Sequence, residues 1–181
     1  MARVAVIDPK TATGEARKLL DAVQSGLGMV PNFIRVLANS PAALNAFLGI
    51  HGIAGAGLLD AKTRERIALA VAEQNACQYC VSAHTAIGRK AGLDNQEMLA
   101  NRMGRSSEAK AEAALIFARA LVEHTGQVSK AEFEAVRAAG HSDGEIIEII
   151  THVAMNIFTN LLGKATQVEI DFPKIDLNKA A

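Results

Sequence analysis

Residues 145–163, EIIEIITHVAMNIFTNLLG, are the segment that most limits how this chain can fold. Apolar side chains fall on nearly every face of a helix drawn over this segment, and Ser142 with Glu145 marks the helix start as a capping box. A helix that is hydrophobic all round lies at the centre of a core or is shared with another subunit. We therefore expect an all-α protein organised around this helix, and a homo-oligomer.

The composition indicates the same fold class. Half of the 181 residues are apolar, but only 4% are aromatic and tryptophan is absent. Sandwiches and barrels depend on β-branched and aromatic strand residues, so this balance favours helices. A chain of this length buries a hydrophobic core without disulfide or metal staples. We expect residues 1–181 to form a single domain, with a motif core at 58–92.

The charge pattern argues against two classes of partner. Nineteen basic residues balance nineteen acidic ones, and no run of lysine or arginine forms a stripe that could neutralise phosphates or anionic lipid. We therefore expect no nucleic acid and no membrane surface as partners. The apolar run in the opening MARVAVIDPK is too short for the core of a signal peptide. This favours a cytoplasmic protein, in which the thiols can stay reduced.

Local signals predict where the helices begin and end. Asp8-Pro9 is expected to open a first helix that stops at Gly26 and Gly28. The remaining predicted signals are helix starts at Pro31, Pro41 and Asp60, a break at Asn75-Ala76, a new start at the cysteine pair with a stop at Gly92, and capping boxes at Asp94/Glu97, Ser129/Glu132 and Ser142/Glu145. After Phe172 we expect an extended arm or a frayed end.

The stretch CQYCVSAH, residues 77–84, contains both cysteines of the chain. At helical spacing Cys77, Cys80 and His84 lie on one face, and cysteines three apart in a first turn can reach disulfide geometry. The unpaired N–H groups of a helix start favour a thiolate, and His84 is placed to accept the thiol proton. The pattern therefore predicts a reactive thiol site.

Three other interpretations of the cysteines compete with this one. A disulfide this short would restrain little of the unfolded chain, so stapling is the weakest. A structural zinc site needs four ligands, and the chain has no further cysteine, so we expect no metal and no cofactor. The cysteines can also be small core residues with an incidental histidine, but CxxC followed by histidine at four is a specific pattern.

The stretch TRERIALAVAEQNACQYCVSAHTAIGRKAG, residues 63–92, resembles the core of the alkyl hydroperoxidase D-like (AhpD-like) proteins, within the carboxymuconolactone decarboxylase superfamily. Their signature is a glutamate, a CxxC twelve residues later, and a histidine four after the second cysteine. Glu65, Cys77, Cys80 and His84 match it position by position. The flanks VPNFIRVLANSPAALNAFLGIHG and AAGHSDGEIIEIITHVAMNIFTN are similar to the peroxidase-related branch, so the likeness covers most of the chain.

This resemblance implies a multihelical fold, with a helical bundle and a helical-hairpin arm, that assembles into trimers or hexamers. It also implies a peroxidase in which Cys80 attacks hydrogen peroxide or an organic hydroperoxide and becomes a sulfenic acid, which Cys77 resolves as a disulfide. Glu65 and His84 would form the proton relay. The implied reductant is a protein dithiol or a lipoyl group.

The match leaves open how the acid reaches the thiols. On one continuous helix, Glu65 would lie about a third of a turn away from Cys77. The expected break at Asn75-Ala76 lets two helices fold back and bring the carboxylate to the cysteines. Glu73, four residues before Cys77, is the local rival and is interpreted as a solvent-facing acid. Tyr79 stands where some relatives carry a histidine between the cysteines.

Two other functions remain open from the sequence. One is a decarboxylase or isomerase acting on a muconolactone-like acid, although those relatives work without the cysteine pair. The other is a non-catalytic redox sensor in which the disulfide alters assembly.

Overall fold

The structure, a computed structural model, describes residues 2–178, and all the regular secondary structure in that range is helical. The expected all-α fold class is confirmed. The helices are α1 (Gly14–Leu27), α2 (Asn32–Leu37), α3 (Pro41–Gly55), α4 (Ala61–Gln74), α5 (Gln78–Lys90), α6 (Asn95–Arg102), α7 (Ala109–Glu123), α8 (Lys130–Ala138) and α9 (Asp143–Thr166).

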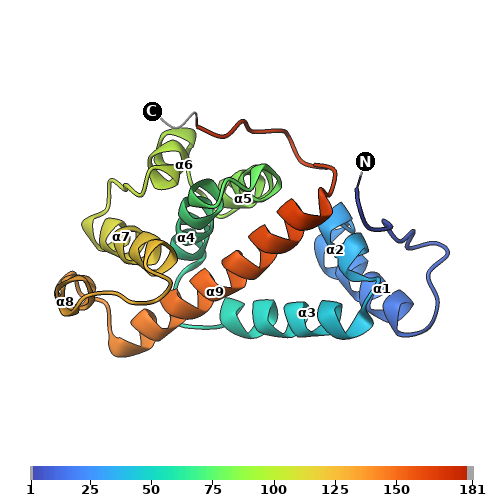
Figure 1. The fold of residues 1–181 in the computed structure, drawn as a ribbon, viewed down its shortest axis with the longest axis horizontal. Coiled ribbons are helices and arrows are strands. Elements are labelled where there is room, and N and C mark those ends of the chain that lie inside the picture. Colours follow the sequence, from blue (N-terminus) through green and yellow to red (C-terminus); the bar gives the residue numbers. More distant parts are fainter. Residues whose placement is uncertain (1, 179–181) are drawn as a thin grey trace.

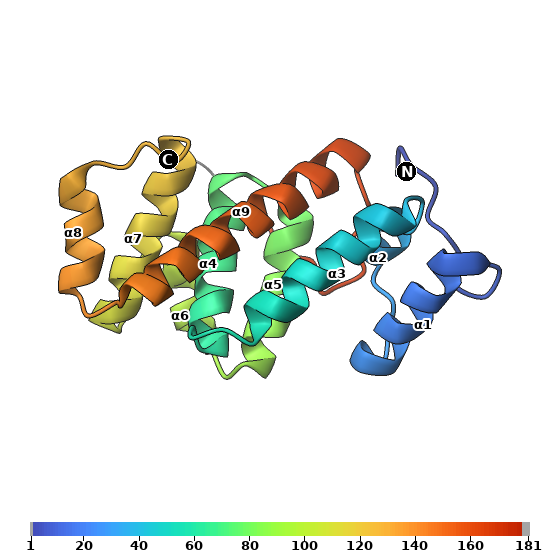
Figure 2. The ribbon, with the colours of Figure 1, turned by 90° about the horizontal axis from the view of Figure 1, so that it is seen from below.

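Helix α4 is the hub of the fold. It packs against α5, α6, α7 and α9, and residues 67–72 of its sequence are almost completely buried. Helix α9 runs obliquely across the molecule, with α7 and α8 near its beginning and α1 to α3 toward its other end (Figure 1). Seen from below, α3 lies alongside α9 (Figure 2). The fold therefore places the α4–α5 pair against the middle and end of α9.

The buried apolar side chains form two main clusters. One joins α4, α7, α8 and α9, with Phe117, Ile67 and Ile146 at its centre. The other gathers α1, α2 and α3 around the first turn of α5 and includes both cysteines. The second cluster is the one that encloses the thiol motif, so packing from distant parts of the chain controls access to the sulfur atoms.

Helix α9 was expected to lie at the centre of the core or to be shared with another subunit, and within this single chain only one side of it is buried. Ile146, Ile149 and Val153 are buried, but Ile147 is 62% exposed and Leu161 is 65% exposed. By length and composition α9 is also the one helix in residues 2–178 that could cross a membrane, but one side of it is buried in the protein core. The helix therefore has one stripe in the core and a second apolar stripe on the surface.

Most helix boundaries follow their local signals. Asp60, Asp94, Ser129 and Ser142 each accept a hydrogen bond from the backbone N–H three residues on, as N-caps do. The capping boxes at Ser129 and Ser142 are complete. The box at Asp94 is not, because the Glu97 side chain turns inward to Arg66, Asn101 and the loop before α7.

The predicted start of the first helix was wrong. The backbone N–H groups of Thr11 and Ala12 donate to the Asp8 carbonyl, and the Asp8 carboxylate accepts from the Lys10 N–H. These contacts close a separate turn at Asp8-Pro9, and α1 begins only at Gly14. The end of α1 at Gly28, which has φ +75°, agrees with the predicted glycine stop.

The C-terminal strap, residues 168–178, has no regular secondary structure. It leaves the end of α9, passes over α5 and reaches α6 (Figure 1). The Ile175 N–H donates to Ser82 Oγ at 3.0 Å, and the Asn178 N–H donates to the Glu73 carboxylate at 2.7 Å. Residues 173–178 are therefore an extended arm that is held against the helices rather than a frayed end, and residues 179–181 lie outside the described residues.

Candidate active site

The turn between α4 and α5 sets the position of the first cysteine. Helix α4 ends at Gln74, and Ala76 adopts the left-handed conformation with φ +51°. This conformation is unfavourable for a residue with a side chain, and strained residues of this kind concentrate at functional sites. The Cys77 N–H donates to the Ala72 carbonyl at 2.9 Å, which closes the turn. The predicted break at Asn75-Ala76 is confirmed.

The same turn is anchored to α9. Asn75 donates from Nδ2 to Asn160 Oδ1 at 2.9 Å, and Lys164 donates from Nζ to the Asn75 carbonyl at 2.7 Å. These two bonds hold the start of α5 at a defined place along α9.

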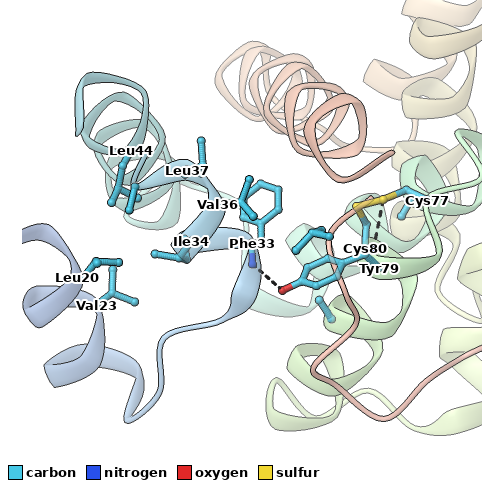
Figure 3. Close-up of a cluster of buried hydrophobic side chains, with 14 of the residues drawn as sticks. Leu20, Val23, Phe33, Ile34, Val36, Leu37, Leu44, Cys77, Tyr79 and Cys80 are labelled. Carbon is cyan, nitrogen blue, oxygen red and sulfur yellow. Dashed lines mark hydrogen bonds between the residues drawn. A yellow bond between two sulfur atoms is a disulfide. The ribbon is translucent and has the colours of Figure 1, made fainter. Parts of the chain in front are cut away.

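Cys77 and Cys80 form a disulfide across the first turn of α5, with their Cα atoms 5.3 Å apart (Figure 3). Cys77 is the N-cap of the helix, and its sulfur accepts the Cys80 N–H at 3.4 Å. The two residues are 1% and 3% exposed. When the bond is reduced, the free N–H groups and the dipole at this helix start favour a thiolate over a thiol.

Helix α9 approaches the disulfide at a glycine. A Cβ atom built on Gly163 would lie 3.3 Å from Cys77 Sγ and 3.8 Å from Cys80 Sγ. A Cβ atom here would be in ordinary contact with Cys80 Sγ but tight against Cys77 Sγ, so a side chain at this position requires a small shift of α9 or of the disulfide. Gly163 could not be identified from the sequence, because the signal is the absence of a side chain about eighty residues away from the cysteines.

Glu65 on α4 meets His84 on α5. The distance between Glu65 Oε2 and His84 Nδ1 is 2.8 Å, and the two side chains are 16% and 21% exposed. A carboxylate only accepts hydrogen bonds, so His84 Nδ1 is the donor in this contact, and in a neutral imidazole of this tautomer Nε2 is the proton acceptor. His84 follows Cys80 by four residues in α5 and so lies on the same helix face.

Glu73 was wrongly interpreted as a solvent-facing acid. Its carboxylate pairs with Arg102 Nε at 2.7 Å, and the Glu73 side chain is 11% exposed. The second oxygen accepts the Asn178 N–H. Glu73 therefore links α4 to α6 through one carboxylate oxygen and to the C-terminal strap through the other.

Tyr79 lies between the cysteines and is 7% exposed. Its hydroxyl donates to Asp171 Oδ1 at 2.9 Å and accepts the Phe33 N–H at 3.3 Å (Figure 3 shows the second bond). Burial and then the Asp171 charge raise the pKa of Tyr79 far above its ordinary value, so the side chain remains a neutral hydrogen-bond donor. Asp171, which no sequence pattern indicated, is the partner that reaches this position from the C-terminal strap.

The four predicted site residues form two contacting pairs on α4 and on α5 with its N-cap. The structure brings the predicted Glu65 and His84 into direct contact and joins Cys77 to Cys80. Within residues 2–178, no three side chains of the His, Cys, Asp and Glu types are arranged to hold a metal ion. A buried pair of cysteines at a helix start, with an oriented imidazole on the same helix, is an arrangement suited to thiol–disulfide chemistry.

The part of the chain that contains the cysteines matches a known protein family. Residues 41–124, from the start of α3 to the end of α7, match the carboxymuconolactone decarboxylase family. An uncharacterized protein of Haemophilus influenzae is 51% identical over 45 residues. That match spans 24% of this chain and 40% of the length of the relative.

Solved structures share the fold over nearly the whole chain. The AhpD core of an uncharacterized peroxidase-related protein from Ralstonia eutropha JMP134 superposes with a TM-score of 0.82 and 27% identity, over 94% of this chain and 92% of that one. An uncharacterized peroxidase-related protein from Silicibacter sp. TM1040 superposes with a TM-score of 0.81 and 26% identity, over 93% and 91% of the two chains.

Proposed function

We propose that this chain, which belongs to the carboxymuconolactone decarboxylase superfamily as an AhpD-like member, is a thiol-dependent peroxidase. Its substrates would be hydrogen peroxide or organic hydroperoxides. The observation that carries the proposal is the contact between Glu65 and His84, because it orients an imidazole on the helix face that carries Cys80. The peroxidase-related names of the two structural relatives support the same assignment.

In the proposed oxidative step, His84 Nε2 takes the proton of the Cys80 thiol while Glu65 stabilises the imidazolium. The Cys80 thiolate attacks the outer peroxide oxygen and the O–O bond breaks. Cys80 becomes a sulfenic acid, and the alkoxide leaves as an alcohol with the proton from His84. For hydrogen peroxide the leaving group is water.

In the resolving step, the Cys77 sulfur attacks the sulfenic sulfur of Cys80. The S–OH bond breaks, a disulfide forms, and the hydroxide leaves as water with the proton from Cys77. The disulfide state of the structure corresponds to the product of this step. An external dithiol then returns two electrons and two protons to the cysteines.

We also propose the setting in which this cycle operates. The reductant would be a protein dithiol or a lipoyl group, the protein would be cytoplasmic, and the assembly would be a homo-oligomer, either a trimer or a hexamer. The balanced charge of the chain supports neither nucleic acid nor a membrane surface as a partner.

The direct test is peroxide consumption by the full chain with a panel of dithiol reductants. We expect turnover with at least one of them and loss of turnover in Cys80→Ser. Glu65→Gln should lower the rate by roughly 100-fold or more, which is typical for loss of general acid–base assistance. Glu134→Gln, at an exposed carboxylate on α8, is the matched control and should leave the rate unchanged.

Two outcomes would overturn the peroxidase assignment. Turnover of a muconolactone-like acid by protein with both thiols blocked would favour a decarboxylase. A peroxide-driven change in oligomer size without catalytic cycling under any reductant would favour a sensor.

A further inference from the structure

Two segments of very different rigidity, helix α9 and the C-terminal strap, pack around the cysteines. Gly163 of α9 lies against both sulfur atoms, and α9 is a continuous helix of 24 residues whose inner stripe is part of the core. The C-terminal strap belongs to the same apolar cluster as the cysteines, through Val168, Ile170 and Phe172 among others. Figure 3 shows the strap, in faint red, running beside Tyr79, which Asp171 and Phe172 of the strap contact.

Side-chain hydrogen bonds hold the strap across α5. Asp171 is the central contact, because Oδ1 accepts the Tyr79 hydroxyl at 2.9 Å and Oδ2 accepts the Asn32 N–H at 2.7 Å. Farther along, Gln78 donates to Asp176 Oδ1 at 3.0 Å. The Phe172 ring also packs edge-on against Tyr79, with 5.8 Å between centroids.

These contacts make the strap easier to displace than α9. A segment without regular secondary structure has no ladder of backbone hydrogen bonds to lose when it lifts. Each hydrogen bond between side chain and strap is worth about 1 kcal/mol net. The strap apolar residues Ile170, Phe172, Ile175 and Leu177 are only partly buried. Lifting the section of the strap around Asp171 therefore costs less than displacing α9, whose inner stripe would have to leave the core.

We infer that the C-terminal strap is a displaceable cover over the Cys77–Cys80 disulfide, held shut by Asp171, and that a bulky dithiol reductant must displace it to reach the sulfur atoms. The inference rests on the proposed function for its reductant. A peroxide is small and its reaction needs only the reduced sulfur of Cys80. A dithiol must instead place its own sulfur in line with the S–S bond, and the cysteines are 1% and 3% exposed.

The reductive step that this cover controls is a thiol–disulfide exchange. A thiolate of the reductant attacks one protein sulfur, the S–S bond breaks, and a mixed disulfide forms while the other protein sulfur leaves as a thiolate. The second thiol of the reductant then attacks the mixed disulfide. The reductant ends as a disulfide, and its two protons end on Cys77 and Cys80.

The test measures the two half-reactions of Asp171→Ala separately. Oxidised protein is mixed with dithiothreitol or with a reduced thioredoxin, and protein thiols are counted over time. The emission of Tyr79, the only tyrosine in a chain without tryptophan, offers a second signal from the same turn. Reduced protein is mixed with peroxide in a parallel experiment.

We expect Asp171→Ala to be reduced roughly tenfold faster by thioredoxin than the unaltered protein, because two hydrogen bonds that hold the strap are lost. The acceleration with dithiothreitol should be smaller, and the rate of oxidation by peroxide should change by less than about twofold. Gln78→Ala removes only the contact with Asp176. It should also accelerate reduction of the disulfide by thioredoxin, but by less than Asp171→Ala does. Lys110→Gln, which breaks an ion pair with Glu145 away from the strap, is the control.

Equal reduction rates in Asp171→Ala and the unaltered protein would overturn the inference. A parallel change in both half-reactions would do the same, since it would make Asp171 a general support of the fold. If Asp171→Ala does not fold, an unchanged thioredoxin rate in Gln78→Ala decides against the cover. Reduction is measured on the disulfide itself, so this result is independent of whether peroxide is the true oxidant.

Discussion

Gly163 shows how one residue controls the surroundings of the cysteines. Its missing side chain leaves room for both sulfur atoms, and a Cβ atom would come within 3.3 Å of Cys77 Sγ. Replacing a helical glycine by alanine usually stabilises the helix by about 0.5–1 kcal/mol. At Gly163 that gain is opposed by contact with the disulfide.

The pair Gly163→Ala and Gly52→Ala tests this contact. Gly52 lies within α3, and a Cβ atom there would meet nothing within 4 Å. We expect Gly52→Ala to raise the free energy of unfolding of the oxidised protein by about 0.5–1 kcal/mol. Gly163→Ala should gain less or lose stability. Equal gains in urea unfolding would show that the sulfur atoms exert no pressure on this position.

The residues that could be predicted from the sequence are those with a local pattern. Cys77, Cys80 and His84 occupy one helix face by spacing alone, and Glu65 was selected by the motif of the resembling family. Asp171 hydrogen-bonds to a tyrosine 92 positions away, so no window of sequence contains both partners. Glu73 was misjudged for the same reason, because its partners come from α6 and the C-terminal strap.

At the scale of the elements, helix starts were predictable because an N-cap oxygen and the backbone N–H that donates to it lie three residues apart. Helix α7 escaped prediction, and its N-cap residue Glu108 makes no side-chain capping bond. Glu108 instead pairs with Arg66 of α4. Because the Glu108 side chain binds Arg66 instead of the backbone of α7, the residues around position 108 contain no local pattern that marks the helix start.

Glu97 binds several elements together at one buried carboxylate. It accepts hydrogen bonds from Arg66 of α4, from Asn101 of α6 and from Ser106 and Ser107 of the next loop. Burial opposes its ionisation, but the bonds from Ser106, Asn101 and Ser107 prevail and hold the pKa of Glu97 at about 2. The ordinary value is 4.5.

This shift predicts a pH dependence of stability. The pKa of Glu97 is lower in the folded state, so its contribution is complete above about pH 4.5 and is lost as the pH falls toward 2. At pH 7 we expect Glu97→Gln to lower the free energy of unfolding by about 3 kcal/mol. The difference between the two proteins should shrink toward pH 2 in urea unfolding. A difference that stays constant from pH 7 to pH 2 would contradict the role of the charge.

At the scale of the whole molecule, several large apolar side chains are exposed to solvent, because no other part of the chain within residues 2–178 covers them. Ile53 on α3 is 80% exposed, and Ile147 and Leu161 on α9 are also exposed. Helices α3 and α9 lie side by side (Figure 2), and each presents exposed apolar side chains at the surface. Such residues favour contact with another copy of the chain, which supports the proposed homo-oligomer.

Ile53→Glu is predicted to weaken that assembly, because a charge buried at a subunit contact costs free energy. Sedimentation equilibrium should show a lower mass for the variant than for the unaltered protein. The matched control is Ile116→Glu, at a 57% exposed isoleucine on α7, and it should leave the mass unchanged. A monomer for the unaltered protein, or equal masses for all three proteins, would refute this surface as the interface.

Mass spectrometry of Cys77→Ser after peroxide treatment and trapping of sulfenic acid is the direct test of Cys80 as the peroxide-reactive thiol. Without Cys77 the sulfenic acid cannot close to the disulfide, so the account predicts one trapped adduct at Cys80. The adduct should form much more slowly when Glu65→Gln is added. An unmodified Cys80 in a folded protein would contradict the assignment of this cysteine as the peroxide-reactive thiol.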